Sequence, residues 1–442
     1  MNGTLHGADA AFCGVSTDSR SISAGQLFFA LRGPNFDGRR FVAAAAAAEA
    51  AGAVVEQELK SAVPQITVRD ARRALGTLAA AWRCGQKATV VGVTGSNGKT
   101  TLKEMIAACL SQSAATLATE GNLNNEIGLP LTLLRLGDEH RYAVIEMGAN
   151  HAGEIAYLAS LAKSQIVVIS NAGSAHLEGF GSIDGVAQAK GEILETRCRP
   201  QVAVLNADDP YFDYWRAKAN DLRVLSFGLD NEATVSAADI HFGESATCFA
   251  LVLPGQRVPI ELPLAGRHNV LNACAAAAVS LALDIPAEQI RAGLQASVPI
   301  SGRLQRREAP NGAVVFDDSY NANPVSAVAA AEFLAAQAGD TILVLGDMGE
   351  LGDDAPALHA AVGRAASEAG IGRLLATGEL SRHAVEAFGD HGCWFADVNA
   401  LIDRLRALTN RGSRVLVKGS RAMRMERVVE ALIDSSSSAE AG

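Results

Sequence analysis

The sequence lacks the cysteine spacings that would build a disulfide framework or a zinc site. Its seven cysteines are odd in number, are scattered along 442 residues and form no C-x-x-C pair. They are Cys13, Cys84, Cys109, Cys198, Cys248, Cys274 and Cys393. We therefore expect free thiols in a reducing compartment, the cytoplasm.

Long hydrophobic runs are missing as well. The longest apolar stretches, near residues 42–48 and 273–283, are shorter than the roughly 20 residues that cross a bilayer, and we expect both to form buried, alanine-rich helices. Asp9, Asp18 and Arg20 interrupt the first 30 residues, where a secretion signal needs an unbroken apolar stretch of about 7 to 15 residues. The sequence predicts neither a membrane span nor an export signal.

The chain has fewer basic than acidic residues: 38 Lys+Arg against 48 Asp+Glu, which gives a formal net charge of −10. With 49% hydrophobic and 19% charged residues, this is the composition of an acidic globular protein, and no nucleic-acid partner is expected. At about 100 to 200 residues per domain, the length predicts two to four domains and excludes a single small module.

Short β-branched runs recur along the chain, each followed by Gly, Asn or Asp and then by a helical pattern. This is typical of buried parallel strands in βα units. The runs are residues 89–93, 143–145, 166–169, 202–205, 313–316, 342–345 and 415–417. Pro299, Gly302 and Pro310 separate two complete series, so we expect two α/β sheets with a boundary near residue 300. An alternating pattern between residues 224 and 263 predicts antiparallel strands added to the central domain.

We therefore predict an α/β fold of three domains. A small N-terminal α/β domain is expected at residues 1–86, a central parallel-sheet domain at residues 87–299 and a C-terminal α/β domain at residues 300–434. The low-complexity residues 435–442 are expected to be a disordered tail.

The strongest chemical signal lies in residues 89–102, where a buried strand, a Gly/Ser/Asn loop and a helix start follow one another. In such a phosphate loop the backbone N–H groups face a polyphosphate, Lys99 serves the β and γ phosphates, and Thr100 or Thr101 can reach a magnesium ion. The strict G-x-x-x-x-G-K-[ST] spacing is not met, and we expect Gly95 to take the turn position. The alternative is a Gly-rich turn with an exposed lysine.

Two further strand ends carry candidate metal ligands. Glu146 follows residues 143–145, and because carboxyl ends of parallel strands face the ligand crevice, it can converge with Lys99 if their strands are neighbours. A cap for the next helix is the alternative for this carboxylate. His176 lies on a Gly-rich loop after residues 166–169 and is a second candidate, with a solvated loop histidine as the alternative.

Asn269 and Asn272 lie three residues apart at a predicted helix start. Either amide could present a donor and an acceptor to an adenine edge. N-capping of the helix by Asn269 is the alternative, and it is compatible with the first interpretation.

Seven motifs together resemble those of the Mur ligases, ATP-dependent enzymes that form amide bonds in peptidoglycan synthesis. They are Gly95-Ser-Asn-Gly-Lys-Thr-Thr101, Glu120-Gly-Asn-Leu-Asn-Asn-Glu-Ile-Gly-Leu-Pro130, Glu146-Met-Gly-Ala-Asn-His151, Ala175-His-Leu-Glu-Gly-Phe-Gly181, Ala189-Lys-Gly-Glu-Ile193, Gly266-Arg-His-Asn-Val-Leu-Asn272 and Asp317-Asp-Ser-Tyr-Asn-Ala-Asn-Pro324. The resemblance covers nearly the whole chain. It implies a UDP-binding N-terminal domain, a central P-loop ATPase-like domain and a Rossmann-like C-terminal ligase domain.

Within the family, the chain resembles most the branch that adds D-alanyl-D-alanine to UDP-N-acetylmuramoyl-tripeptide. The Asp-Asn-Pro-Arg motif of the branch that adds diaminopimelate or lysine is absent from the sequence, whereas Gly346-Asp-Met-Gly-Glu-Leu-Gly352 is present. The resemblance implies an acyl-phosphate intermediate made from ATP. The alternatives are a folylpolyglutamate synthase, against which Thr17-Asp-Ser-Arg20 argues, and a nucleotide-binding scaffold without catalysis.

The resemblance also implies roles for single residues. The catalytic set is Lys99, Glu146, His176 and Lys190. The ligands of two Mg²⁺ ions are Thr100, Glu146, His176 and Lys190, the last as a carbamate formed with CO₂, although its local sequence alone indicates an ordinary helical lysine. ATP is expected to contact Gly95, Ser96, Asn97, Gly98, Lys99, Thr100, Thr101, Asn269, Asn272, Arg303 and Asp318. The residues expected to contact the substrates are Ser19, Arg20, Asn122, Asn124, Asn125, Asn321 and Asn323. We expect the protein to be a monomer.

Overall fold

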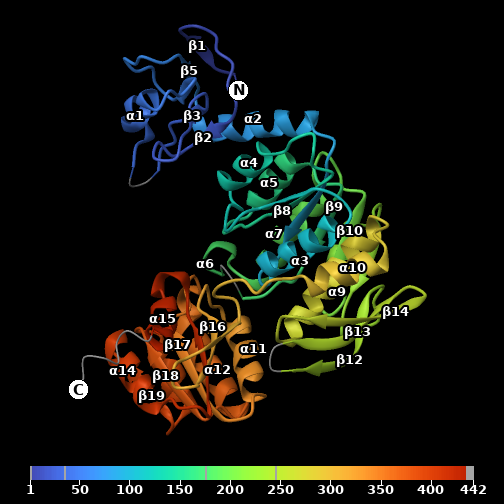
Figure 1. Cartoon of the computed structure of the whole chain (residues 1–442), viewed down its shortest axis with the longest axis vertical. Coiled ribbons are helices and arrows are strands. Elements are labelled where there is room, and N and C mark those ends of the chain that lie inside the picture. Colours follow the sequence, from blue (N-terminus) through green and yellow to red (C-terminus); the bar gives the residue numbers. More distant parts are fainter. Residues whose placement is uncertain (1, 34–35, 175–176, 244–245, 435–442) are drawn as a thin grey trace.

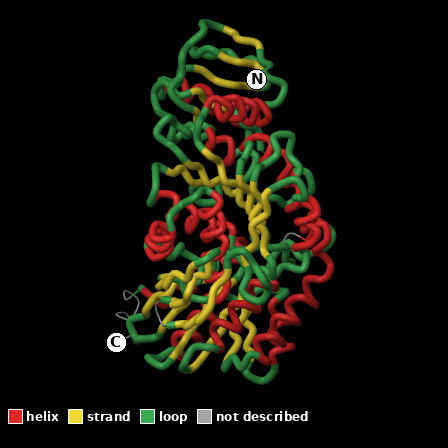
Figure 2. The backbone as a smooth tube through the Cα atoms, turned by 90° about the vertical axis from the view of Figure 1, so that its right-hand side faces the viewer, coloured by secondary structure: helices red, strands yellow, loops and turns green. Residues whose placement is uncertain are grey.

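Three sheet-based units follow one another along the long axis of the molecule (Figures 1 and 2). The computed structural model describes residues 2–33, 36–174, 177–243 and 246–434. The predicted α/β class is confirmed, and each of the seven predicted parallel-sheet strands is present. Among the described residues, no helix combines the length and apolarity needed to cross a membrane. The predicted tail, residues 435–442, lies outside the described part of the chain.

The N-terminal unit is a five-stranded sheet in the order β1-β5-β4-β3-β2, parallel except for the β1–β5 pair. Its strands are β1 (Thr4–His6), β2 (Val15–Ser16), β3 (Leu27–Phe29), β4 (Gly52–Val55) and β5 (Gln65–Thr67). The short turn η1 (Gly38–Phe41) leads into helix α1 (Val42–Ala47) on one face. The prediction that this helix is buried is wrong for most of its length, because only Val42 and Ala45 face the sheet.

Helix α2 (Ala71–Gly85) joins the N-terminal unit to the rest of the molecule. Asp70 starts it by accepting a hydrogen bond from the Arg73 backbone N–H. Leu75 packs under the N-terminal sheet, whereas Ala79 belongs to the core of the central unit. Since α2 packs against both, the boundary between residues 86 and 87 stays a prediction.

The central unit is a six-stranded, all-parallel sheet in the order β11-β10-β9-β6-β8-β7. Its strands are β6 (Thr89–Thr94), β7 (Thr116–Ala118), β8 (Tyr142–Glu146), β9 (Ile166–Ile169), β10 (Val202–Asn206) and β11 (Arg223–Phe227). One face is covered by α3 (Lys99–Ser111), α9 (Arg267–Ala282) and α10 (Ala287–Gln295). The other carries α4 (Gly128–Leu133), α5 (Glu154–Ala162), α7 (Ile183–Gly191), η2 (Glu192–Leu194) and α8 (Phe212–Lys218). Helices on both faces explain why these strands are continuous apolar runs.

The predicted antiparallel strands form a separate three-stranded sheet of β12 (Ser236–Phe242), β13 (Thr247–Leu253) and β14 (Gln256–Leu262). Its apolar face packs against α9 and α10 in the core of the central unit. The alternation between buried and exposed residues along β14 is what the sequence pattern predicted.

The C-terminal unit is a second six-stranded sheet, in the order β15-β16-β20-β17-β18-β19. The strands are β15 (Gln305–Glu308), β16 (Val314–Asp318), β17 (Asp340–Gly346), β18 (Arg373–Thr377), β19 (Gly392–Phe395) and β20 (Ser413–Lys418), and only β15 is antiparallel. Helices α11 (Pro324–Ala335), α12 (Ala355–Glu368) and α13 (Ser381–Phe388) cover one face, and α14 (Val398–Leu408) and α15 (Glu426–Ile433) the other. Short turns η3 (Gly352–Asp354) and η4 (Arg421–Met423) complete the unit.

Candidate active site

The loop between β6 and α3 has the backbone of a phosphate loop. Gly95 has φ 150° and Gly98 has φ 77°, in the region that favours glycine. A Cβ atom on Gly95 would lie 1.9 Å from the Ser170 Oγ, and one on Gly98 would lie 2.9 Å from the Asn272 Oδ1. Both positions therefore require glycine, and Gly95 lies at the expected turn.

The loop after β9 holds the phosphate loop in place through Asn171. The Asn97 backbone N–H donates to the Asn171 Oδ1 at 2.9 Å, and the Asn171 Nδ2 donates back to the Asn97 carbonyl at 3.1 Å. The Ser96 hydroxyl donates to the Gly173 carbonyl at 3.2 Å and accepts from its N–H at 2.9 Å. Asn171 is not among the site residues predicted from the sequence, although its place two residues after the end of a buried strand is a signal for such a role.

Lys99 begins helix α3, and its side chain folds back over the loop. Its Nζ donates to the carbonyls of Gly95 at 2.8 Å and Ser96 at 3.2 Å. Desolvation lowers the pKa of Lys99 below its usual value, the negative charge of Glu146 opposes this, and the positive charge of Arg303 adds to it. The ammonium group thus lies at the mouth of the loop.

Glu146 ends β8 beside β6, opposite Val93, so the expected neighbourhood of the two strands is confirmed. The carboxylate is 2% exposed, and its Oε1 accepts from the Asn124 Nδ2 at 2.7 Å. Its Oε2 is buried and has no hydrogen-bond partner in the described part of the chain. A buried carboxylate oxygen without a partner fits a site for a cation.

Lys190 lies in the last turn of α7 with 1% of its surface exposed. Its Nζ lies 5.2 Å from the centre of the Phe180 ring, and within the described ranges it has neither a hydrogen-bond acceptor nor an ion pair. Burial lowers the pKa of Lys190 to about 7, and the charge of Lys99 contributes, against the opposing carboxylates of Glu192 and Glu154. A large fraction of neutral amine at neutral pH follows.

A carboxylate two residues further on ties this helix to the loop that follows Glu146. The Glu192 side chain accepts hydrogen bonds from the backbone N–H groups of Gly153 at 2.7 Å and Ala156 at 3.0 Å, at the start of α5. The segments that carry Lys190 and Glu146 are thereby linked. The helix start is a favourable place for a carboxylate.

The remaining predicted metal ligands are Thr100 and His176. The Thr100 hydroxyl accepts a hydrogen bond from the Arg303 Nη2 at 3.0 Å. His176 lies outside the described residues. In the described ranges, no three His, Cys, Asp or Glu side chains gather as a metal cluster. The oxygens of Glu146 and Thr100 are nonetheless the donor type that Mg²⁺ prefers.

The two asparagines expected near adenine are buried in the first turns of α9, beside the phosphate loop. The alternative of N-capping by Asn269 is wrong, because Gly266 occupies the N-cap and the Asn269 Nδ2 donates to the Ala265 carbonyl at 2.7 Å. Asn272 lies one turn further, against Gly98.

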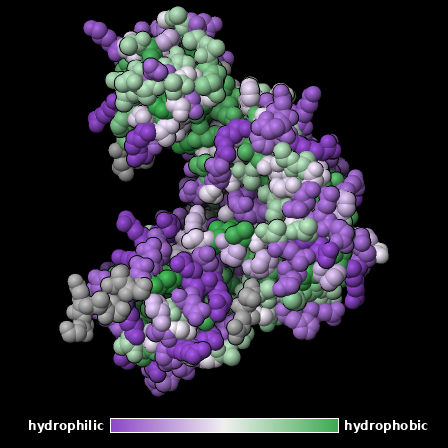
Figure 3. Space-filling view, viewed as in Figure 1, coloured by the Kyte–Doolittle hydropathy of each residue, from purple (hydrophilic) through white to green (hydrophobic). Residues whose placement is uncertain are grey.

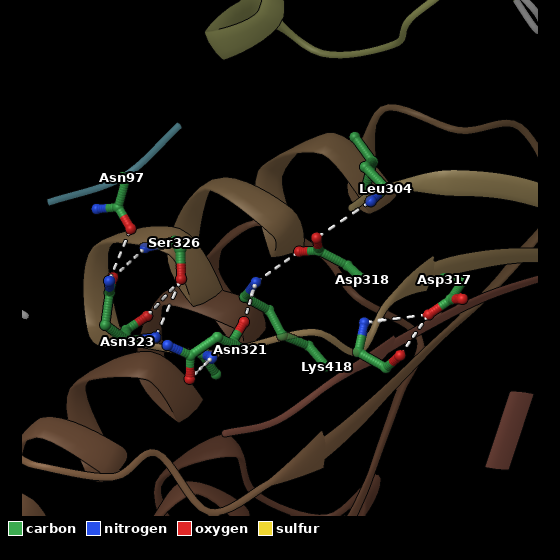
Figure 4. Close-up of polar contacts among 10 residues, drawn as sticks. Asn97, Leu304, Asp317, Asp318, Asn321, Asn323, Ser326 and Lys418 are labelled. Carbon is green, nitrogen blue, oxygen red and sulfur yellow. Dashed lines mark hydrogen bonds and ion pairs between the residues drawn. The ribbon is translucent and has the colours of Figure 1, made fainter. Parts of the chain in front are cut away.

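Groups of the C-terminal unit reach the phosphate loop (Figure 4). The Asn323 Nδ2 donates to the Asn97 Oδ1 at 2.7 Å, while its Oδ1 caps α11 by accepting from the Ser326 N–H at 2.9 Å. Asp318 accepts from the Lys418 Nζ at 2.5 Å.

Two further contacts complete this edge of the C-terminal unit. The Lys418 Nζ also donates to the Asn321 carbonyl at 3.1 Å, which fixes the loop before α11. The Arg303 guanidinium stacks on the Tyr320 ring at 4.3 Å while it contacts Thr100. An arginine and a helix N-cap of the C-terminal unit therefore contact the phosphate loop and the start of α3.

Four of the predicted substrate residues are not brought to the site formed by the phosphate loop and Glu146. Ser19 and Arg20 lie on the N-terminal unit, where Arg20 is exposed and pairs with Asp18 at 2.6 Å. Asn122 is exposed, and Asn125 accepts from the Gly128 N–H at 2.9 Å at the start of α4. Of the three predicted asparagines before α4, Asn124 is the one with a hydrogen bond to Glu146 in the described part of the chain.

A cavity of about 820 Å³, which was not predicted from the sequence, lies between the N-terminal and central units. It is lined by Arg32, Gly33, Glu56, Asp70, Arg72, Arg73, Glu126, Gly148, Ala152, Gly153, Glu154, Tyr157 and Leu158. Its lining holds three arginines and four carboxylates, and Arg72 is paired with Glu126 at 2.8 Å. Figure 3 shows the molecule hollowed on one side between the N-terminal and C-terminal units. Of the lining residues, Glu126 and Gly148 belong to motifs on which the family resemblance rests, although neither motif by itself indicates a cavity.

Known proteins resemble this chain over nearly its full length. Three family profiles match: "Mur ligase family, catalytic domain" at residues 12–83, "Mur ligase middle domain" at residues 93–280 and "Mur ligase, glutamate ligase domain" at residues 302–421. The UDP-N-acetylmuramoyl-tripeptide–D-alanyl-D-alanine ligase of Escherichia coli is 45% identical over 98% of this chain and 96% of its own.

Two solved structures are also similar to this chain over nearly its full length. A crystal structure of MurF from Acinetobacter baumannii has a TM-score of 0.90 at 39% identity, covering 95% of this chain and 92% of its own. The MurF ligase of Thermotoga maritima, in complex with ADP, has a TM-score of 0.87 at 28% identity, covering 96% and 98%.

Proposed function

The chain belongs to the Mur ligase family, and from this premise we propose that it adds D-alanyl-D-alanine to UDP-N-acetylmuramoyl-tripeptide. It is an ATP-dependent ligase of peptidoglycan precursor synthesis. The observation that carries the proposal is the contact of the C-terminal unit with the phosphate loop, at Arg303–Thr100 and Asn323–Asn97. A ligase that joins an acid held on one unit to an amine held on another needs this juxtaposition.

The reaction needs an activated carboxylate, because an amine does not displace an oxide leaving group at a useful rate. The γ-phosphoryl group of ATP passes to a carboxylate oxygen of the tripeptide, which gives an acyl phosphate and ADP. The dipeptide amine then attacks the carbonyl carbon, the amine loses a proton, and phosphate leaves. Positioning and neutralisation of charge are the tasks of the protein.

Backbone N–H groups of residues 95–98 and the start of α3 would hold the phosphates, as helix N-termini do. Lys99 now donates to two loop carbonyls, and we expect it to exchange them for phosphate oxygens when ATP binds. Arg303 adds a second cation on the side of the C-terminal unit. We propose that Asn269 and Asn272 read the adenine base, and their burial beside the phosphate loop supports this.

Magnesium fits the residues present, because the buried Oε2 of Glu146 has no partner among the described residues and the Thr100 hydroxyl is close to the loop. Bound there, the ion would neutralise charge on the phosphates and orient them. Asn124 holds the other oxygen of Glu146, which fixes the direction in which the free oxygen points.

Lys190 does not fit this site as an ammonium group, since a cation would repel both Lys99 and a metal ion. We propose that it reacts as the neutral amine with CO₂ to give a carbamate, whose oxygens can serve a second Mg²⁺. Its burial, its lack of a partner in the described chain and its pKa of about 7 support this.

We propose that the diphosphate of the UDP-linked substrate contacts the arginines of the cavity, Arg32, Arg72 and Arg73, of which Arg72 is paired with Glu126 in this structure. The acceptor dipeptide would approach from the C-terminal unit, where Asp318 and Asn321 lie. All of these groups come from one chain, so the proposed working unit is a monomer. We place the reaction in the cytoplasm, where ATP is supplied.

Release of phosphate from ATP is the measurement that tests this function. We expect release only when UDP-N-acetylmuramoyl-tripeptide and D-alanyl-D-alanine are both present, and none with Lys99→Ala, which removes the cation at the phosphate loop. Exposed Lys87→Ala, on the same unit, is the matched control and should leave turnover unchanged. Strong turnover with free diaminopimelate and the dipeptide precursor, or with a folate and glutamate, would contradict the proposal.

The carbamate has its own test. Lys190→Ala should lose nearly all activity, and formate or acetate should restore part of it by filling the vacated space. Lys190→Arg stays cationic, so it should be inactive with or without the added carboxylate. Mass analysis of bicarbonate-equilibrated protein gives a readout independent of activity, and a free amine on active protein would contradict the proposal.

A further inference from the structure

One buried cation takes no part in the chemistry described so far. Lys103 lies four residues after Lys99 on helix α3, so the two side chains share one face of the helix. Its side chain is 0% exposed, among buried apolar neighbours such as Leu102 and Ile106. An apolar residue would fill this position without the cost of desolvating a charge, so a lysine here calls for a specific contact.

The contact is with the segment that follows β7. The Lys103 Nζ donates to the Thr119 carbonyl at 2.5 Å and pairs with the half-exposed carboxylate of Glu104. Thr119 is itself buried, and its Oγ1 accepts from the Glu146 backbone N–H at 3.0 Å. One residue thus joins the buried lysine to the strand end that carries Glu146.

The same segment also reaches the Glu146 side chain. Residues 119–125 run from Thr119 to the asparagines that precede α4, and the Asn124 Nδ2 donates to the Glu146 Oε1 at 2.7 Å. The Asn124 carbonyl accepts from the Gly148 N–H at 2.9 Å, which ties the loop to the far side of Glu146. Lys103, on helix α3, therefore holds the start of residues 119–125 in place. This loop in turn forms hydrogen bonds with both the backbone and the side chain of Glu146.

We propose that Lys103 is a positioning residue that fixes the loop of residues 119–125, and through it the Glu146 carboxylate, relative to the phosphate loop. Its role in catalysis rests on the proposed function, in which Glu146 holds a metal ion. The placement of the loop does not, and it can be measured on the protein without nucleotide or metal.

Lys103→Met removes the ammonium group and keeps a side chain of similar length. We expect kcat to fall by about 10- to 100-fold, as for other residues that orient a metal ligand through an intermediate group. The KM for ATP should change by less than about threefold, because the loop N–H groups and Lys99 are untouched. The concentration of Mg²⁺ that gives half-maximal rate should rise.

Glu104→Gln is the matched control, because it removes the countercharge of Lys103 and leaves the contact with Thr119 in place. We expect it to keep nearly all activity. If Glu104→Gln reproduced the loss seen with Lys103→Met, the ion pair and not the loop would be the function of Lys103. Thr119→Val, which removes the acceptor of the Glu146 N–H, should resemble Lys103→Met, whereas Thr119→Ser should resemble the native protein.

Hydrogen exchange on the metal-free protein separates positioning from stability. Lys103→Met should speed exchange in residues 119–125 and at Glu146, with residues 202–206 of β10 unchanged. Equal acceleration everywhere would show a structural role and overturn the proposal. If Lys103→Met does not fold, Thr119→Val carries the same test. Local exchange as expected, in a native protein without ligase activity, would leave the positioning intact and refute the proposed function instead.

A double-mutant cycle that combines Lys103→Met with Asn124→Ala tests whether Lys103 acts through this loop. If Lys103 acts through the loop that carries Asn124, the double variant should be no slower than the slower single variant. Independent, additive losses in kcat would show that Lys103 does not act through this loop.

Discussion

Replacement of Lys190 by methionine should stabilise the protein at neutral pH while it abolishes activity. The side chain is 1% exposed and its Nζ lies 5.2 Å from the centre of the Phe180 ring, so the charged form loses most of its hydration in the folded protein. Burial lowers the pKa of Lys190 from 10.5 to about 7. Because each pKa unit corresponds to about 1.4 kcal/mol, the cost of the charged form is about 5 kcal/mol.

The pH dependence follows from the direction of this change. Below pH 7 Lys190 is charged in both states, and the cost is fully present. Between pH 7 and 10.5 the unfolded state holds a proton that the folded state has released, so the stability of the native protein rises with pH by about 1.4 kcal/mol per unit. Above pH 10.5 both states are neutral and the cost is gone. Lys190→Met should therefore be more stable than the native protein by about 5 kcal/mol at pH 6, and equally stable near pH 10.5.

Urea unfolding in CO₂-free buffer, followed by tryptophan fluorescence, measures this difference. Trp215 is fully buried in the central unit and its Nε1 donates to the Ala187 carbonyl of α7 at 2.9 Å, so it reports on the helix that carries Lys190. The exposed Lys87→Met variant is the control and should show no pH-dependent difference. A stability difference that is the same at pH 6.5 and pH 10 would refute the reasoning, because a desolvated ammonium must show this slope.

Three other predictions concern the nucleotide and the substrates. Gly98→Ala should weaken ATP binding measured by calorimetry, since φ 77° costs a side chain about 1–2 kcal/mol and its Cβ would meet Asn272; Gly255→Ala, with φ 80° and open space around it, is the control. Equal ATP affinity in the Gly98 variant and the native protein would argue against a glycine requirement. Asn272→Ala should raise the KM for ATP more than it lowers kcat, because adenine contacts stabilise ground and transition states alike; a pure kcat effect would place Asn272 elsewhere. A non-hydrolysable ATP analogue with the UDP-linked tripeptide should reduce the radius of gyration in small-angle scattering, as the hollow in Figure 3 closes; an unchanged radius at saturation would count against closure.

The chain order of elements could be predicted because each parallel strand is buried on both sides and so appears as a continuous apolar run. All seven predicted runs overlap parallel strands of the two six-stranded sheets. The phosphate loop could be predicted for a related reason: Gly95, Gly98 and Lys99 act through backbone geometry and charge that are local to one strand, one loop and one helix start. For helix α1, the alanine-rich composition predicted burial, and this prediction was wrong because an alanine-rich helix can lie on the surface of a sheet.

Relations between distant segments were decided by the tertiary structure. The neighbourhood of β6 and β8, which places Glu146 beside Lys99, depends on a strand order that no local pattern encodes. The burial that lowers the pKa of Lys190 comes from packing around a helical turn whose own sequence is ordinary. Contacts such as Arg303–Thr100, across 203 positions of sequence, and the arginine-lined cavity exist only once separate units pack together. The sequence by itself determined which local segments have the backbone of a phosphate loop or form strands, because those properties depend on neighbouring residues. The tertiary structure decided which charges meet, because Coulomb interactions and desolvation depend on distance in space.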